Sequence, residues 1–253
     1  MDSKIEIEDS VKTAARDKII ELYSSQNITP SVKFEDFRCP SKLFCLGTKD
    51  KDKWRSGTWA YIGSQYGEAQ INGKFTKVLI VAMDKGGYGG TEELIFEKTQ
   101  NHFRTLAEAP GNGHMRGVSL ILKYLLDEKD KYKYSIQYSL TNAVKCSTER
   151  DNMDAVRQNR VISNCSIHLK REINILNPDI IITQGKHPGL TIRHFFPANG
   201  EIREFEKVSL WETERQFVLA TPHPTRLKGM RYRSGEMPKY YYEAIDALKE
   251  LFR

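Results

Sequence analysis

The sequence predicts an α/β protein, a three-layer α/β/α sandwich with a central, mainly parallel four-stranded sheet. Two observations predict this class. Four short apolar runs of strand length are spread along the chain, and long segments with helical periodicity separate them. Strands buried on both faces have this uninterrupted apolar character, and helical crossovers connect them. Ligands of such sheets bind outside the carboxyl ends of the strands, so the residues that follow each run are candidate site residues.

The elements follow from these patterns in chain order. The expected strands are residues 77–83, 135–144, 179–183 and 217–221. The expected helices are residues 9–24, 92–107, 115–126, 153–176 and 239–252. Charged loops are expected at residues 49–55 and 127–133. No linker divides the chain, so we expect a single domain over residues 1–253, with residues 1–35 as an N-terminal helical extension.

The composition is that of an ordinary globular protein with a basic excess. Lys and Arg number 39 against 33 Asp and Glu, which gives a net charge of +6. No apolar stretch approaches the roughly 20 residues of a membrane helix, and the N-terminus has no apolar signal-peptide core. We therefore expect a cytoplasmic monomer with no membrane association. The positive charge suits DNA as a partner, although many basic proteins bind no polyanion.

Polar residues stand at the ends of three of the expected strands. They are Asp84, Asn142 and His223. Taken singly, each also fits an ordinary turn, because Asp and Asn satisfy turn backbones and a His beside Pro is a common loop residue. The carboxyl ends of parallel strands lie at one edge of a sheet, so we expect the three side chains to meet in one cavity.

Three segments resemble the motifs of a known family in their order and spacing. They are VLIVAMDKGG (78–87), LTNAVKC (140–146) and ATPHPT (220–225). They resemble the uracil-DNA glycosylase superfamily, and TNAVKC is closest to its iron-sulfur (family 4-like) branch. The resemblance covers roughly residues 39–252 and implies the α/β/α fold and an N-glycosyl hydrolase acting on DNA.

The resemblance also implies roles for the three strand-end residues. Asp84 lies at the position of the catalytic aspartate that positions water, Asn142 at that of the asparagine that binds the flipped base, and His223 at that of the histidine that stabilises the departing base. The chemistry needs such groups, because the N-glycosidic bond breaks toward a cationic sugar and an anionic base. Asp84 and His223 are therefore the expected catalytic residues.

The expected base-binding residues depart from the branch in part. Met83 stands where the branch has Glu, and Met115 stands where the branch has a stacking Phe. A methionine packs against a base without an aromatic face. Tyr88 is an alternative stacking residue and is equally an ordinary loop aromatic. The expected base-binding set is Asn142, Met83, Tyr88 and Met115.

A basic segment, RLKGMRYR (226–233), follows the third motif. It is either a solvated basic loop or a clamp on the DNA backbone, and its place beside His-Pro-Thr favours DNA contact. Lys85 stands where the branch has Pro. The expected DNA-binding residues are Lys85, Thr225, Arg226, Lys228, Arg231 and Arg233.

The chain has four cysteines, Cys39, Cys45, Cys146 and Cys165. They are either buried free thiols, ligands of a zinc ion or ligands of a 4Fe-4S cluster. Their order is that of the cluster ligands in the iron-sulfur branch, so the resemblance implies a 4Fe-4S cluster. Five residues separate the first pair, where the branch usually has two.

These observations predict a monofunctional DNA glycosylase that flips a nucleotide, hydrolyses its N-glycosidic bond and leaves an abasic site. Uracil is the expected base. The altered first motif, with its added glycines, leaves open a bulky modified base, such as a modified cytosine in phage DNA removed in antiviral defence. A rival of another class is a non-catalytic iron-sulfur protein that binds DNA.

Overall fold

The computed structural model describes residues 2–28, 36–46, 54–57, 60–83, 113–129, 133, 136–148, 155–224 and 236–253. The chain divides into two compact units, each assembled from segments far apart in the sequence. The first unit draws its described residues from 1–60, 83–95 and 141–177, and the second from 61–82, 96–140 and 178–253. The expected single domain stays a prediction.

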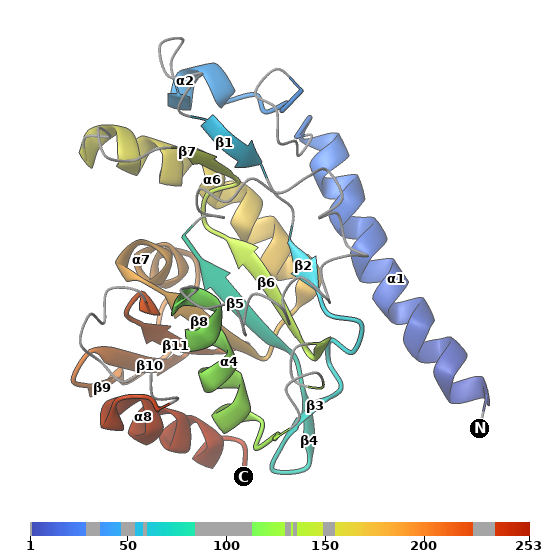
Figure 1. Ribbon diagram of the computed structural model, residues 1–253, viewed down its shortest axis with the longest axis vertical. Helices are drawn as coiled ribbons and strands as arrows, with labels where there is room; N and C mark the ends of the chain where they lie inside the picture. The colour runs from blue at the N-terminus through green and yellow to red at the C-terminus, as the bar shows by residue number, and fades with distance from the viewer. Residues whose placement is uncertain are drawn as a thin grey trace. The chain divides into compact units, whose positions relative to one another are not determined.

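The second unit is built on a sheet with the order β2-β6-β5-β8-β11-β10-β9 (Figure 1). Strands β5 and β11 both pair with the central β8 in parallel. Strands β10 and β9 continue the sheet antiparallel beyond β11, and β2 pairs antiparallel with β6. The last two residues of β6 belong to the first unit. The bounds are β2 Tyr61–Ile62, β5 Val78–Ala82, β6 Tyr138–Asn142, β8 Ile180–Gln184, β9 Arg203–Phe205, β10 Val208–Glu212 and β11 Phe217–Thr221.

The predicted fold class is confirmed, but the predicted number of strands is wrong. The four predicted strands are the neighbours β6, β5, β8 and β11, and the described part of the chain adds three more strands to them. The added strands lack an apolar run, which explains why the sequence did not reveal them. Strand β9 is largely exposed, β10 mixes buried and exposed positions, and β2 has two residues.

Helices cover both faces of this sheet. On one face Ile80, Ile182 and Leu219 share an apolar core with helices α4 (Gly113–Leu125) and α8 (Lys239–Glu250). The alternate residues point to the opposite face. There, helix α7 (Lys186–Phe195) packs on β8 and β11, and its Gly189 lies directly over Thr183. This arrangement gives the second unit its three layers.

Helix α7 was not predicted, because its sequence KHPGLTIRHF begins with loop-like residues. Pro188 lies in the first turn of the helix, where a backbone N–H has no helical partner and its loss costs little. The Pro-Gly pair therefore begins a helix here, and it does not mark a loop.

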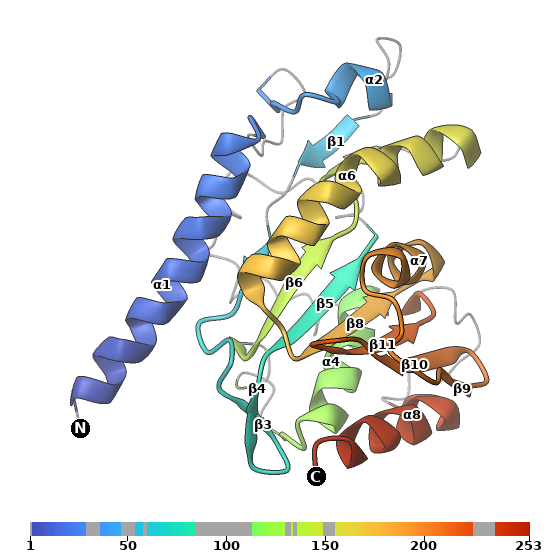
Figure 2. The ribbon, with the colours of Figure 1, turned by 180° about the vertical axis from the view of Figure 1, so that it is seen from behind.

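The first unit contains helices α1 (Asp2–Ser25), α2 (Lys42–Leu46) and α6 (Ala155–Leu176). Both α1 and α2 pack on α6, which Figure 2 shows most clearly. Strands β1 (Trp54–Gly57) and β7 (Cys146–Thr148) form an antiparallel pair. The N-terminal segment predicted as an extension is thus packed, with Ile19 and Tyr23 of α1 fully buried.

Four of the five predicted helices are present in the structure. Residues 115–126 and 239–252 correspond to α4 and α8, residues 9–24 to α1 and residues 153–176 to α6. The helix expected at residues 92–107 lies outside the described residues, as do residues 49–53 of the loop expected at residues 49–55. Residues 54–55 of that loop begin strand β1, so this part of the prediction is wrong. A short hairpin of β3 (Ala69–Ile71) and β4 (Lys74–Thr76) completes the second unit, and its Asn72-Gly73 turn has both φ angles positive, as a two-residue hairpin requires.

Candidate functional site

The turn that follows Asn142 is buried and hydrogen-bonded within the first unit. Asn142 ends strand β6 and is 5% exposed. The backbone N–H of Val144 donates to the carbonyl of Met83 at 2.8 Å. Met83 directly precedes Asp84, which lies outside the described residues, as do Lys85 and Tyr88. The turn of the Asn142 motif is therefore tied to the backbone that leads into Asp84.

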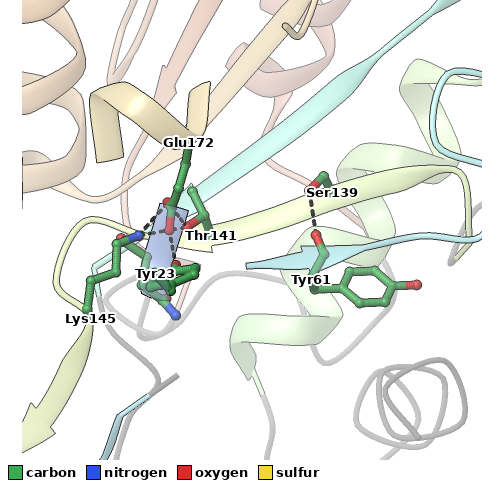
Figure 3. A network of polar contacts seen from close by, with 7 residues as sticks. Tyr23, Tyr61, Ser139, Thr141, Lys145 and Glu172 are labelled. Carbon is green, nitrogen blue, oxygen red and sulfur yellow. Dashed lines mark hydrogen bonds and ion pairs between the residues drawn. The ribbon is translucent and has the colours of Figure 1, made fainter. Parts of the chain in front are cut away.

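A buried polar network also holds this turn (Figure 3). Lys145 donates through Nζ to Glu172 Oε2 at 2.5 Å, to Thr141 Oγ1 at 2.9 Å and to the carbonyl oxygen of Asn142 at 2.6 Å. Glu172 lies in α6 and also accepts from Thr141 Oγ1, at 2.6 Å, and from the hydroxyl of Tyr23 in α1. The side chains of Lys145 and Glu172 are 3% and 0% exposed. The network fixes the backbone at Asn142 through groups from three elements.

Burial acts on both members of the ion pair in this network. It lowers the pKa of Lys145 to about 7 and raises the pKa of Glu172 well above its usual range. Three donors, from Lys145, Thr141 and Tyr23, oppose this effect at Glu172 because they favour the carboxylate. A pair held at this depth needs all its partners, and removal of one would leave a buried charge without compensation.

All four cysteines lie in the first unit and none forms a disulfide. Cys39 precedes α2, Cys45 lies in it, Cys146 begins β7 and Cys165 lies in α6. Burial raises the pKa of the Cys146 thiol well above its usual value, and Cys165, Cys39 and Cys45 raise it further. Burial also raises the pKa of Cys165 to about 11. The thiols therefore influence one another, and thiolate at these positions requires a positive partner.

Within the described ranges, no group of three or more His, Cys, Asp and Glu side chains is arranged to hold a metal ion. The cysteines are thus neighbours in one unit without the arrangement of an ion site. The predicted metal site stays a prediction.

His223 lies in the second unit, directly after β11, and its surroundings form a second candidate site. Its ring stacks on that of His114 at the start of α4, with centroids 5.4 Å apart and planes inclined by 16°. Gly185 has a φ of +107°, and a Cβ at this position would lie 3.5 Å from Cβ of His223. A glycine is favoured here because of this positive φ, and the contact with His223 would be an ordinary van der Waals one.

Two polar side chains beside His223 have unpaired atoms. Gln184, the last residue of β8, is fully buried, and neither its Nε2 nor its Oε1 has a hydrogen-bond partner. The Nε2 atom of His114 also lacks one. Burial, and then His223, lowers the pKa of His114 to about 4. The side chain of Gln184 lies near enough to the imidazole to oppose the shift, although the two groups do not meet hydrogen-bond geometry. His114 is therefore neutral near pH 7.

The other predicted site residues are placed only in part. Met115 is buried in the apolar core of the second unit, and its contact with a base stays a prediction. Thr225, Arg226, Lys228, Arg231 and Arg233 lie outside the described residues. Asn142 and His223 belong to different units, so the cavity expected to join them with Asp84 stays a prediction as well.

Sequence reasoning missed Glu172, Gln184 and His114. Gln184 carried a usable signal, because it directly follows an apolar run at the carboxyl end of an expected strand. Glu172 carried none, since a glutamate in a charged helix normally faces solvent.

Residues 70–249 match the family model described as the Uracil DNA glycosylase superfamily, which is more than half of the chain. The match includes Asn142, Cys146, Cys165 and His223 and leaves Cys39, Cys45 and α1 outside. No curated protein matches the sequence. None of the helices that the structure describes has the length and apolar character to span a membrane.

Proposed function

Because the chain belongs to the uracil DNA glycosylase superfamily, we propose that it is a monofunctional DNA glycosylase that flips a nucleotide from DNA and hydrolyses its N-glycosidic bond. The product is an abasic site. The observation that carries the proposal is the family match, which includes both described motif residues, Asn142 at the end of β6 and His223 after β11. Superfamily membership supports DNA glycosylase activity in general; the reaction details and the base are part of the proposal.

The chemistry assigns one role to each motif residue. His223 donates to the base oxygen that gains negative charge as the bond breaks. Asn142 binds the polar edge of the flipped base, and its amide offers both donor and acceptor. Asp84 orients water toward the cationic sugar. The hydrogen bond between Val144 and Met83 supports these roles, because it links the backbone beside Asp84 to the Asn142 turn.

DNA is the proposed partner, and the basic segment is its proposed contact. Thr225, Arg226, Lys228, Arg231 and Arg233 follow His223 directly in the sequence, and Lys85 follows Asp84. Phosphate contacts by such residues release counterions, so changing Arg231 to Ala should weaken DNA binding and reduce the salt slope by about one. Unchanged salt dependence would exclude this residue from the interface.

Uracil is the proposed base, and a bulkier modified base is the alternative. Met83 stands where the iron-sulfur branch has glutamate. The glycines among residues 86–90 have no side chains, which would leave more room for a base in the expected pocket. A modified cytosine in phage DNA would fit this alternative, as in antiviral defence. Asn142 does not choose between these bases, because its amide rotates to match either edge.

A 4Fe-4S cluster is the proposed cofactor, held by Cys39, Cys45, Cys146 and Cys165. Its support is that all four thiols share one compact unit and that Cys165, Cys39 and Cys45 raise the pKa of Cys146 beyond the effect of burial. A cluster also spaces its ligands more widely than one ion does, which is compatible with the absence of an ion site among the described residues. Zinc is the alternative with the same ligands. The group would supply electrostatic stabilisation to thiolates that link α2, β7 and α6, and hydrolysis requires no redox step.

The test is a panel of oligonucleotides that carry uracil, thymine, cytosine or modified cytosines, followed by alkali to reveal abasic sites. We expect cleavage at one class of base. Changing Asp84 to Asn should leave DNA binding intact and abolish abasic product, and changing His223 to Ala should reduce base release by about 100-fold or more. DNA binding with no product from any substrate would favour the non-catalytic protein.

A further inference from the structure

The carboxyl end of β8 is the best placed position of the sheet for a ligand. Strand β8 lies between β5 and β11, and both neighbours run parallel to it. The carboxyl ends of these three strands therefore lie at one edge, where α/β sheets bind their ligands. Gln184 ends the central strand, between the strand that leads to Asp84 and the strand that leads to His223. No motif of the sequence accounts for it.

Three buried polar atoms at this edge are unpaired. They are Nε2 and Oε1 of Gln184 and Nε2 of His114, and none has a partner among the described residues. Buried amides in folded proteins are normally paired, because an unpaired group loses its bonds to water. Gln216, another buried glutamine of the same unit, is paired with Thr213, whereas Gln184 has both amide atoms unpaired. The unpaired atoms therefore point to a ligand.

The chemistry of the two side chains defines that ligand. The carboxamide of Gln184 offers donors and an acceptor, and the neutral imidazole of His114 offers its Nε2, a donor or an acceptor according to the tautomer. The site carries no charge of its own, so a charged ligand would be poorly compensated at this depth. An uncharged group that both donates and accepts hydrogen bonds fits. The amide edge of a nucleobase has this character, and so does a hydroxyl substituent on a base.

We propose that Gln184 and His114 form a base-reading site beside His223, which binds an uncharged group of the excised base that both donates and accepts hydrogen bonds. The stacking of His114 on His223 places the reading group next to the residue assigned to the leaving base. The inference rests on the proposed glycosylase function. It adds residues that select the base and leaves the roles of Asn142 and Asp84 unchanged.

The first test measures binding without catalysis. Free uracil, cytosine and 5-hydroxymethylcytosine are added at millimolar concentration to the full-length protein, and thermal melting is followed. Gln184→Met and His114→Phe remove the polar atoms and keep the approximate side-chain size. Gln216→Met is the matched control, because this buried glutamine is already paired.

We expect Gln184→Met to melt no lower than the wild type, because it removes unpaired groups, and Gln216→Met to melt lower. At least one base should raise the wild-type melting temperature, with about tenfold or more weaker binding to Gln184→Met and His114→Phe. Binding of unmodified bases would identify the base edge as the recognised group. Binding of 5-hydroxymethylcytosine alone would identify the hydroxyl. Equal binding by the wild type and Gln184→Met, or no binding of any base by the wild type, would overturn the inference.

A second measurement separates this inference from the glycosylase proposal. Base release from the oligonucleotide panel is compared for the wild type and Gln184→Met under single-turnover conditions. A changed ratio of rates between bases supports the reading site, and an unchanged ratio with active enzyme refutes it while the glycosylase proposal stands. If no oligonucleotide yields product but free bases bind through Gln184, the glycosylase proposal fails and the binding site stands.

Discussion

Replacing Lys145 with Met should strongly destabilise the first unit. Its ammonium donates to Glu172, to Thr141 and to the backbone of Asn142, and the side chain is almost completely buried. Methionine retains the length of the apolar stem but leaves Glu172 without its cation. Breaking a buried pair from one side costs about 3–5 kcal/mol. Since domains are stable by about 5–15 kcal/mol, the loss would be a large share of the total.

The assay is urea denaturation followed by circular dichroism. The matched control is Lys239→Met, because Lys239 forms an exposed pair with Glu243 whose side chains are 89% and 46% exposed. That variant should lose about 0.5 kcal/mol or less. Iron content measured on the same samples shows whether a change at Lys145 acts through the neighbouring Cys146. A loss at Lys145 no larger than that of the control would refute the view that the network stabilises the turn.

A double variant checks whether the cost belongs to the pair. Lys145→Met combined with Glu172→Met removes both charges and replaces them with apolar side chains. Such replacements of buried pairs are often neutral or stabilising. The double variant should therefore be more stable than Lys145→Met alone, in spite of its additional substitution. Additive losses would show that the two residues act independently.

Three further predictions concern other parts of the molecule. The pKa of His114 falls from 6.5 to about 4 on folding, so the unfolded chain binds more protons between these pH values. Stability that is present above pH 6.5 should therefore be lost as the pH falls toward 4, by at most about 3 kcal/mol. His114→Phe should flatten this part of the curve of unfolding free energy against pH. Gly185→Ala should cost about 1–2 kcal/mol in thermal or urea denaturation because φ is +107°. It should leave base release unchanged, because the added Cβ would lie in ordinary van der Waals contact, 3.5 Å from Cβ of His223. Gly200→Ala, also at positive φ but exposed and with open space around it, should cost a similar amount of stability. Cys165→Ser should remove iron and the visible absorption of the purified protein, and full retention of both would remove this thiol from the ligand set.

The sequence predicted those parts of the fold in which local pattern and burial agree. Strands β5, β8 and β11 are apolar along their length because helices cover both faces of the sheet. The hairpin of β9 and β10 lies at the sheet edge, where exposure breaks the apolar run and local pattern no longer shows a strand. Helix α7 was not predicted for a different reason. Pro188 and Gly189 are typical loop residues, but the first turn of a helix also accepts them.

The candidate site was predictable only where a side chain follows a recognisable strand. Asn142 and His223 stand at such positions, as predicted, and their roles stay predictions. Glu172 was beyond prediction, since its partner Lys145 is 27 residues away and only the packing of α6 brings the two together. Gln184 directly follows the strand expected at residues 179–183, but an amide is not a typical catalytic residue type, so the sequence does not single it out.

The network at Asn142 also includes the segment before the family match. Tyr23 lies in α1, outside residues 70–249, yet its hydroxyl donates to the buried carboxylate of Glu172. Glu172 in turn fixes Lys145, whose ammonium binds the carbonyl of Asn142 at 2.6 Å. The position of the motif asparagine thus depends on a helix that the family motif does not contain. Since buried networks act as a unit, a weakening at α1 is transmitted to the motif turn without any change in the motif itself.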